Sequence, residues 1–254
     1  MADPGVEALA RLIRERGPCV VLTGAGISTE SGIPDFRSPT GLWARVDPTQ
    51  VATIEVFQRD PEQVWRWYGP RIGSLLAAEP NAGHLALAAL EREGWVSAVV
   101  TQNIDMLHSR AGSAEVVEVH GSIGRAVCLR CGTPEPLTEL LEQLAERPTP
   151  RCRACGAVLK PDVVLFGELL PAEPMARAEA LAADAGVLLV VGTTLEVWPV
   201  GGLPERTRSS GGAVAVVNRG PTAFDGRADL RLEGAAGELL TQLAAVLEPS
   251  PEAR

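Results

Sequence analysis

Four of the five cysteines of this chain stand in two Cys-x-x-Cys pairs, Cys128/Cys131 and Cys152/Cys155, with twenty residues between the pairs. Two such pairs joined by a helical segment, here Pro136–Arg147, bring four thiolates together in the tetrahedral geometry that zinc prefers. Redox activity or two disulfides is the competing interpretation, but the spacing fits a zinc ribbon better. Because thiolates would fill all four coordination positions, no water can be activated there, and we predict one structural zinc ion.

A Gly-x-Gly turn, Thr23–Ser28, directly follows the first apolar run, Cys19–Leu22. Backbone amides without obstructing Cβ atoms can approach a pyrophosphate closely at such a turn. An ordinary tight turn would give the same spacing. Thr29 stands where the dehydrogenase fingerprint has its third glycine, and Gly32–Ser38 resembles a ligand-covering loop instead of a second strand. We therefore expect a dinucleotide site that does not transfer hydride.

Further polar side chains gather where strand-like apolar runs end, which is where parallel α/β sheets bind their ligands. His120 follows one such run, Val116–Val119. A lone histidine at a strand end is more often a satisfied core residue, so position alone does not make it catalytic. In the same way, Thr193 and Thr194 follow Val187–Val191 after Gly192, and Asn218 follows Ala213–Val217.

The elements that must position these residues alternate between buried strands and amphipathic helices, such as Val6–Arg16 and His84–Glu93. This α/β alternation predicts a Rossmann-like parallel sheet. Two stretches interrupt it, one polar and Trp-rich and one with the paired cysteines, and we expect them to form a smaller domain. The predicted parts are residues 1–33, 81–120 and 162–248 for the dinucleotide-binding domain, 34–80 for a helical insertion and cofactor loop, 121–161 for a zinc-ribbon module, and 249–254 for a disordered tail.

Composition restricts the class of protein. The chain has 254 residues, 46% hydrophobic and 22% charged, within the range of soluble globular proteins. Its formal net charge of -9 argues against a nucleic-acid partner and suits lysine-rich partners. Cys19–Leu22 is too short to span a membrane, and Met1-Ala2-Asp3 lacks the basic flank of a signal peptide, so we expect a cytoplasmic protein with no membrane partner. Cys19 itself fits a small buried hydrophobe.

In this combination the motifs resemble the sirtuin family. Gly24–Ser28 and Gly32–Arg37 are similar to its paired NAD signatures, and matches continue in order to about Ala236, over nearly the whole chain. The further matches are Thr101–Asp105, His120-Gly121, the two cysteine pairs, Val164–Glu168, Gly192–Thr194 and Val217-Asn218. The resemblance implies that the protein removes acetyl groups, and also succinyl or malonyl groups, from acyl-lysine segments of proteins. NAD is consumed as co-substrate, and nicotinamide and O-acyl-ADP-ribose are released.

The resemblance also implies roles for individual residues. The acyl oxygen attacks the ribose carbon that carries nicotinamide, and His120 then acts as general base on a ribose hydroxyl, for which an imidazole pKa of ~6.5 is suited. Asn103 and Asp105 match the nicotinamide pocket, although both residue types could instead cap the next helix. The implied cofactor contacts are Gly24, Ala25, Gly26, Ser28, Thr29, Asp35, Phe36, Arg37, Gln102, Asn103, Ile104, Asp105, Gly192, Thr193, Thr194 (where the family has serine), Asn218 and Ala236.

Two further matches concern the substrate. Val164, Phe166, Gly167 and Glu168 belong to the segment that pairs with an extended substrate backbone, a mode that demands little of substrate sequence. Tyr68 and Arg71 match the Tyr-x-x-Arg pair of the desuccinylase and demalonylase subgroup, where phenol and guanidinium bind the distal carboxylate. Tyr68 could instead pack on a tryptophan beside a solvated Arg71, and Pro70 could kink the helix between them.

Two other functions fit the same motifs. A protein ADP-ribosyltransferase also begins by displacing nicotinamide from NAD, but His120 favours deacylation. A catalytically silent sensor of NAD and acyl-lysine would keep the pocket without the chemistry, and the predicted base argues against it. A dehydrogenase agrees least with the loop that follows the Gly-x-Gly turn.

Overall fold

The computed structural model of the chain describes residues 3–247. Six strands form a parallel sheet in the order β3-β2-β1-β7-β8-β9, so the order reverses between β1 and β7. The predicted α/β fold with a parallel sheet is confirmed. The strands are β1 (Cys19–Thr23), β2 (Val96–Thr101), β3 (Val116–Glu118), β7 (Val187–Val191), β8 (Ala213–Asn218) and β9 (Leu230–Glu233), the last not predicted from the sequence.

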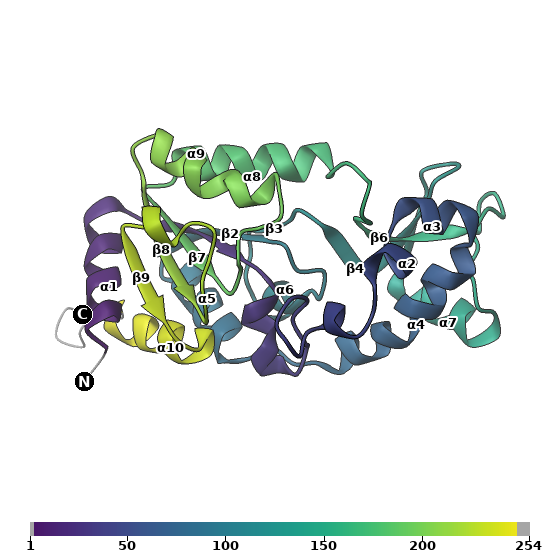
Figure 1. Cartoon of the computed structure of the whole chain (residues 1–254), viewed down its shortest axis with the longest axis horizontal. Helices are drawn as coiled ribbons and strands as arrows, with labels where there is room; N and C mark the ends of the chain where they lie inside the picture. The colour runs from purple at the N-terminus through teal and green to yellow at the C-terminus, as the bar shows by residue number, and fades with distance from the viewer. Residues whose placement is uncertain (1–2, 248–254) are drawn as a thin grey trace.

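Helices cover both faces of this sheet, because β1, β7 and β8 are buried at every position and apolar except at Thr23 and Asn218, the last residues of β1 and β8. One core lies between the sheet and α1 (Pro4–Arg16), α5 (Ala82–Arg92) and α10 (Ala236–Leu247). A second core lies on the opposite face, under α8 (Ala172–Asp184) and α9 (Leu203–Ser209) (Figure 1). The short helix α6 (Leu107–Ala111) follows β2. Four 3-10 helices complete this set: η1 (Ala25–Ser31), η2 (Leu42–Ala44), η3 (Val200–Gly202) and η4 (Asp225–Arg227).

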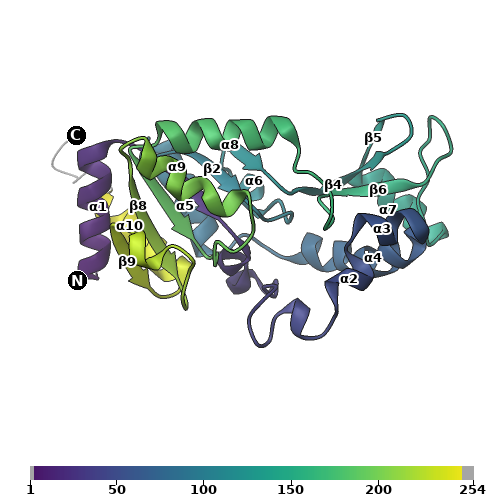
Figure 2. The same ribbon diagram turned by 45° about the horizontal axis from the view of Figure 1, so that its top comes forward.

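A second lobe lies at the opposite end of the molecule from the N-terminus (Figure 2). An antiparallel sheet in the order β5-β4-β6 packs there with four helices around a third core. Trp65 is fully buried in this core and donates its indole N–H to the carbonyl of Leu159, 2.7 Å away, so the helical and ribbon segments share one interior. The elements are β4 (Gly121–Cys128), β5 (Pro134–Pro136), β6 (Leu159–Val163), α2 (Pro48–Val51), α3 (Ile54–Arg59), α4 (Pro61–Ala77) and α7 (Leu137–Glu146).

The boundaries drawn above between the parts of the chain stay a prediction, and the predicted disordered tail lies outside the described residues. Pro70 stands inside α4, yet this helix runs without a break from Pro61 to Ala77. Trp65 precedes and Ile72 follows the proline in this helix, and both are buried in the core of the second lobe, whereas Pro70 is exposed. Within residues 3–247, no helix combines the length and the apolar character needed to cross a membrane.

Two histidines are buried beside the ends of β1 and β2. The rings of His84 and His108 lie 4.8 Å apart between centroids, and His108 Nε2 lies 2.9 Å from the hydroxyl of Thr23. Burial lowers the pKa of His84 to about 4 and that of His108 to about 3, although Asp105 and Glu30 act to raise the pKa of His84. Both rings are therefore neutral in the folded protein near neutral pH.

This pair predicts a loss of stability in mild acid. In the unfolded chain each imidazole titrates near ~6.5, whereas in the folded protein protonation waits until about pH 4 and 3. As pH falls below ~6.5, the two histidines are protonated in the unfolded chain but not in the folded one. This preferential proton binding lowers the free energy of unfolding by up to about 1.4 kcal/mol per pH unit for each histidine. Urea titrations between pH 7.5 and 5 should show this slope.

The matched control is His84→Gln, which removes one of the two titrating groups. Its free energy of unfolding should depend less steeply on pH than that of the parent protein over the same range. Equal slopes for the two proteins would contradict the assignment, whatever the difference in their absolute stability.

Candidate active site

The turns that follow β1 and β7 touch each other backbone to backbone. Gly26 donates its N–H to the carbonyl of Gly192 at 2.8 Å. A Cβ atom on Gly26 would lie 2.7 Å from Cα of Gly192, and one on Gly192, whose φ is 64°, would lie 2.4 Å from N of Ile27. No side chain fits at either position, so both glycines are required for the two strand ends to meet.

This junction presents free backbone donors. The N–H groups of Ala25, Thr193 and Thr194 have no acceptor among the described residues. They come from the carboxyl ends of two adjacent parallel strands, where the strand order reverses, and such amides suit phosphate oxygens. Gln102 joins the group from β2, because its amide donates to the hydroxyl of Thr193 at 3.0 Å. The residues present therefore fit a dinucleotide pyrophosphate.

A buried polar chain runs beside this cradle through Asn103, Ser28 and Asp105. The amide nitrogen of Asn103 donates to the carbonyl of Gly24 and to the hydroxyl of Ser28, each at 3.1 Å. Ser28 in turn donates to Asp105 at 2.7 Å. These contacts leave the amide oxygen of Asn103 as an open acceptor. Asp105 also accepts the N–H of Leu107, the first residue of α6, at 3.0 Å, although Met106 is the N-cap residue of this helix.

His120 stands between the two lobes, at the end of β3. Its Nδ1 lies 3.0 Å from the carbonyl of Gln102. A carbonyl can only accept, so Nδ1 carries the proton of the neutral ring and Nε2 keeps its lone pair. Burial lowers the pKa of His120 below its usual value, the bond to Gln102 raises it, and the positive charge of Arg37 lowers it. The lowered pKa favours the neutral ring, in which Nε2 can accept a proton.

Gly121 turns the chain sharply after His120. Its φ is 77°, and a Cβ atom there would lie 2.1 Å from the carbonyl oxygen of Asp162 in the neighbouring strand. Glycine is therefore the residue that lets β4 pass close to β6 at this point. The carbonyl of His120 accepts the N–H of Val164 at 2.9 Å, which joins the histidine to the segment predicted to hold the substrate.

The predicted cofactor loop is tied to the turn after β7. Asp35 accepts the backbone N–H groups of Arg37 and Ser38 and so forms a local turn. Arg37 lies 3.7 Å from Glu196, which also accepts the hydroxyl of Thr194 at 3.0 Å. Glu196 was not predicted from the sequence, since only the fold brings it to this loop. Phe36 packs against Trp43, with ring centroids 5.3 Å apart.

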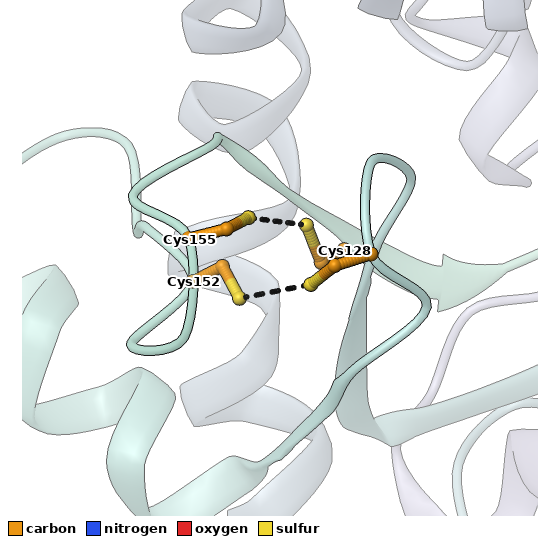
Figure 3. A group of neighbouring side chains, drawn as sticks. Cys128, Cys152 and Cys155 are labelled. Atoms are coloured by element: carbon orange, nitrogen blue, oxygen red, sulfur yellow. Dashed lines mark hydrogen bonds between the residues drawn. The ribbon is translucent and has the colours of Figure 1, made fainter.

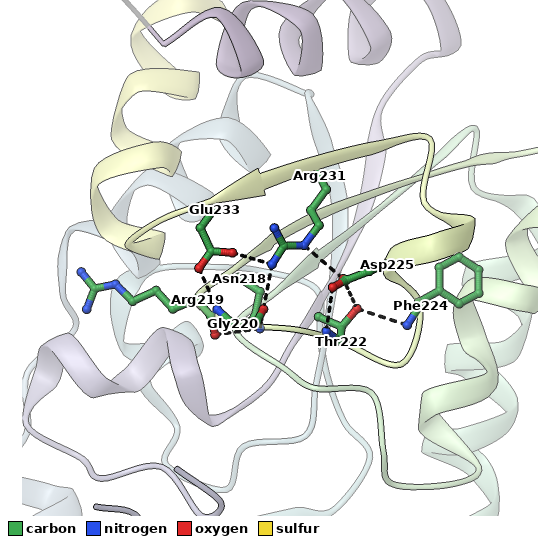
Figure 4. A network of polar contacts seen from close by, with 8 residues as sticks. All are labelled: Asn218, Arg219, Gly220, Thr222, Phe224, Asp225, Arg231 and Glu233. Atoms are coloured by element: carbon green, nitrogen blue, oxygen red, sulfur yellow. Dashed lines mark hydrogen bonds and ion pairs between the residues drawn. The ribbon is translucent and has the colours of Figure 1, made fainter. Parts of the chain in front are cut away.

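The end of β8 carries a second open amide oxygen. Asn218 donates its side-chain nitrogen to the carbonyls of Arg219 and Gly220, at 3.1 and 3.0 Å, which leaves its oxygen free (Figure 4). Ala236 is buried at the start of α10, where Gly237 bonds to Glu30 of η1 at 3.0 Å. Thr29 donates its hydroxyl to the carbonyl of Gly26, and the carbonyl of Ile104 accepts the N–H of Ile123. The cofactor contacts of both residues stay predictions.

The segment Val164–Glu168 is partly paired already. Phe166 exchanges backbone bonds with Ala52 and Ile54 of the helical lobe, at 2.8 and 3.0 Å. Within the described residues, the carbonyl of Val164 and both backbone groups of Gly167 have no partner. An extended chain could pair with those groups.

A buried ion pair holds this segment in place. Lys160 lies 3.0 Å from Glu168, and the same carboxylate accepts the N–H of Leu165 at 2.8 Å. Lys160 also donates to the carbonyls of Pro161 and Val163. Sequence reasoning missed this lysine. No apolar run marks this strand in the sequence, because Lys160, Pro161 and Asp162 stand between its two apolar ends.

Tyr68 and Arg71 lie one turn apart on α4. Tyr68 is 7% exposed and packs edge-on against Trp67, with ring centroids 4.5 Å apart. The guanidinium of Arg71 lies 3.9 Å above the Trp67 ring and donates to the carbonyl of Trp67 at 2.6 Å. Arg71 is half-buried, and no carboxylate of residues 3–247 lies within ion-pair distance of it.

The four paired cysteines come together in the second lobe, and Figure 3 shows Cys128, Cys152 and Cys155 facing one another. The four sulfur atoms all lie within 4.8 Å of one another, with 3.5 Å from Cys128 to Cys155 and 3.6 Å from Cys131 to Cys152. Tetrahedral zinc with Zn–S bonds of ~2.3 Å requires sulfur separations of roughly 3.8 Å. All four cysteines are free of disulfides. The cluster therefore fits one zinc ion.

Known proteins agree with this arrangement. The family model described as Sir2 family matches residues 24–199 of the chain. The NAD-dependent protein deacylase 2 of Pyrobaculum aerophilum is 48% identical over 92% of this chain and 93% of its own length. The NAD-dependent protein deacetylase of Caldivirga maquilingensis is 46% identical over 87% of this chain and 85% of its own length.

Solved structures give the same result. A Sir2 structure with a deacetylated p53 peptide and 3′-O-acetyl ADP ribose matches with a TM-score of 0.90 and 37% identity, over 96% of this chain and 98% of that one. A Sir2 structure bound to a propionylated peptide matches with a TM-score of 0.86 and 37% identity, over 94% and 97% of the two chains. The fold of this chain is thus shared with solved Sir2 structures, and the chain is a member of the Sir2 family, the sirtuins.

Proposed function

We propose that the protein removes acyl groups from lysine side chains of other proteins and consumes NAD in doing so. The observation that carries this proposal is the position of His120. Its ring bonds to Gln102 beside the nucleotide cradle, and its backbone bonds to Val164 of the substrate segment. One residue with an open basic nitrogen therefore adjoins both reactants. The deacylase names of the relatives and the peptide complexes of the Sir2 structures support the same activity.

Each group of the site has a part in this reaction. Bound NAD supplies an electrophilic ribose carbon and nicotinamide as the leaving group. The free amides of Ala25, Thr193 and Thr194 donate to its phosphates, and the oxygen of Asn103 accepts from the carboxamide. Phe36 covers the reacting ribose and excludes water. Nε2 of His120 takes the proton of a ribose hydroxyl, which prepares that oxygen to attack the acyl carbon. The acyl oxygen of the lysine amide bonds to the ribose carbon as nicotinamide leaves, and one water molecule later releases the amine. The products are free lysine, nicotinamide and O-acyl-ADP-ribose.

The substrate lies along the unpaired backbone groups of the segment Val164–Glu168. The carbonyl of Val164 accepts the N–H of the acyl-lysine amide, and Gly167 pairs with the substrate backbone. Because these are main-chain contacts, they accept many protein sequences. The ion pair of Lys160 and Glu168 fixes the segment before the substrate arrives.

We also propose that acidic acyl groups, succinyl and malonyl, are substrates. The half-buried guanidinium of Arg71 lacks a carboxylate partner in residues 3–247 and lies one helical turn from the phenol of Tyr68. A carboxylate at the end of the acyl chain would supply the missing anion and accept charge-assisted hydrogen bonds. Arg71 leaves its contact with the Trp67 carbonyl to make them.

His120→Ala tests the proposed base. NAD binding should persist, and the turnover of an acetyl-lysine peptide should fall by roughly two to four orders of magnitude, the range for a positioned general base. Mass spectrometry of the peptide and of O-acyl-ADP-ribose measures the loss. In the parent enzyme, kcat/KM should decline in acid only below pH ~6.5, because the pKa of His120 is lowered and the base must be unprotonated. An unchanged turnover number would assign the base elsewhere.

Arg71→Met tests the acyl preference, with Arg66→Met on the exposed face of the same helix as its control. Loss of a charged hydrogen bond costs about 1.5–3 kcal/mol, so kcat/KM for a succinyl-lysine peptide should fall roughly ten- to hundred-fold. The acetyl-lysine peptide of the same sequence should change much less, and Arg66→Met should change neither. Equal losses on the two peptides would show that Arg71 does not bind the acyl carboxylate.

One zinc ion per chain is expected at the cysteine cluster, with a structural role only. Replacing Cys128 and Cys131 together with serine should release the metal, as measured by atomic absorption, and lower the thermal midpoint of unfolding. Cys19→Ala, which changes the one cysteine outside the cluster, should retain the metal. Full metal content and unchanged stability in the double variant would rule the site out.

A further inference from the structure

Arg219 is an unpaired cation at the nucleotide-binding edge of the parallel sheet. It directly follows Asn218, the last residue of β8, whose side-chain oxygen is open. The side chain of Arg219 is exposed and has no ion-pair partner within residues 3–247. In Figure 4 it extends away from the other labelled side chains. Its guanidinium is therefore available to an anionic group of a bound nucleotide.

The order of the strands assigns this end of the sheet to the adenosine half of the dinucleotide. His120, where the nicotinamide half reacts, follows β3 at one border of the sheet. The free amides that fit the pyrophosphate belong to the turns after β1 and β7, in the middle of the sheet. β8 lies one strand beyond them, on the side away from β3. A dinucleotide that spans these positions therefore brings its adenosine ribose to Asn218 and Arg219.

The backbone that carries Arg219 is held in place by several hydrogen bonds. The side-chain nitrogen of Asn218 donates to the carbonyls of Arg219 and Gly220, at 3.1 and 3.0 Å. Gly220 donates its N–H to Glu233 at 2.8 Å, and its carbonyl also accepts from Arg231 at 2.9 Å. The side chain of Arg219 therefore starts from a fixed position at the end of β8.

The acidic groups of this network are already paired. A carboxylate at the ribose of an NAD site binds the 2′-hydroxyl and repels a phosphate there, whereas an arginine accommodates a 2′-phosphate. Here the residue at the strand end is Asn218, a neutral amide. Glu233 pairs with Arg231, which also lies 3.2 Å from Asp225. The charge left without a partner in this network is the positive charge of Arg219.

We propose that the site accepts NADP as well as NAD, and that Arg219 binds the 2′-phosphate on the adenosine ribose of NADP. The guanidinium can donate two charge-assisted hydrogen bonds to that phosphate. The inference rests on the proposed deacylase function and widens its class of co-substrate. The added phosphate lies on the nucleoside that does not react, so the bonds that form and break are those described above. The product is an O-acyl-ADP-ribose that keeps the 2′-phosphate.

The test compares NAD and NADP as co-substrates of the full-length enzyme, with one acetyl-lysine peptide and detection by mass spectrometry. NADP should support deacylation with a kcat/KM within about ten-fold of the value for NAD, because the hydrogen bonds of Arg219 offset the desolvation of the phosphate. An enzyme that turns over the peptide with NAD but neither uses nor binds NADP would overturn the inference and leave the proposed function intact.

Variants of Arg219 check its role. Arg219→Leu should lower the ratio of kcat/KM for NADP to that for NAD roughly ten- to hundred-fold, the effect of losing a charged hydrogen bond. Arg219→Lys should give an intermediate ratio, because lysine keeps the charge but not the planar fork. Arg11→Leu removes an exposed arginine of α1 that has no ion pair within residues 3–247, and this control should keep the parent ratio. An unchanged ratio in Arg219→Leu would contradict the assignment.

Binding of mononucleotides locates the phosphate independently of turnover. By isothermal titration calorimetry, adenosine 2′,5′-bisphosphate should bind the parent protein roughly ten-fold more tightly than AMP, and Arg219→Leu should remove this difference. Equal losses for the two mononucleotides would show that Arg219 contacts the shared adenosine monophosphate, which would overturn the inference. If no peptide is turned over with NAD, the proposed function fails, and the difference between the two mononucleotides still decides whether Arg219 binds a 2′-phosphate.

Discussion

The contact between the turns after β1 and β7 is the constraint on which the site depends. Apolar strands buried on both faces bring Thr23 and Val191 into register, and the chain must then turn with almost no space between the two backbones. Glycine at positions 26 and 192 is the solution, because any Cβ atom would collide with the facing backbone. Gln102 and Asn103 take their positions from these turns through hydrogen bonds. A side chain at the junction would therefore disturb residues well beyond it.

The internal hydrogen bonds of the site use side-chain donors at some positions and leave backbone donors free at others. Side-chain donors are used inside the protein, which leaves acceptors open: the oxygens of Asn103 and Asn218, Nε2 of His120 and the carbonyl of Val164. At the strand junction the reverse holds, and backbone donors are open. The open acceptors are complemented by a carboxamide, ribose hydroxyls or an amide N–H on one part of a ligand. The open donors are complemented by phosphates on another part. The site is therefore prepared for its ligands by how its own hydrogen bonds are directed.

Much of this could be predicted from the sequence, because strands buried on both faces are continuous apolar runs and the residues just after them must share one sheet edge. The cysteine pairs were predictable for a similar reason, since their spacing is local. Contacts that depend on the folded chain could not be predicted from the sequence. Glu196 lies near Arg37, and Lys160 near Glu168, because of how the chain folds, and no periodic pattern indicates either contact. Pro70 shows the opposite case, where packing by distant residues overrides a local rule.

The shared core of the second lobe has a consequence for the order in which the protein is made. Trp65 and its carbonyl partner on Leu159 are 94 residues apart in the chain. At a synthesis rate of about 5–20 residues per second, the apolar face of α4 leaves the ribosome several seconds before its partner strand exists. The parallel sheet is also completed late, because β1 lies between β2 and β7, and β7 comes much later in the chain. The buried contacts of both lobes are therefore completed only when synthesis is well past the middle of the chain.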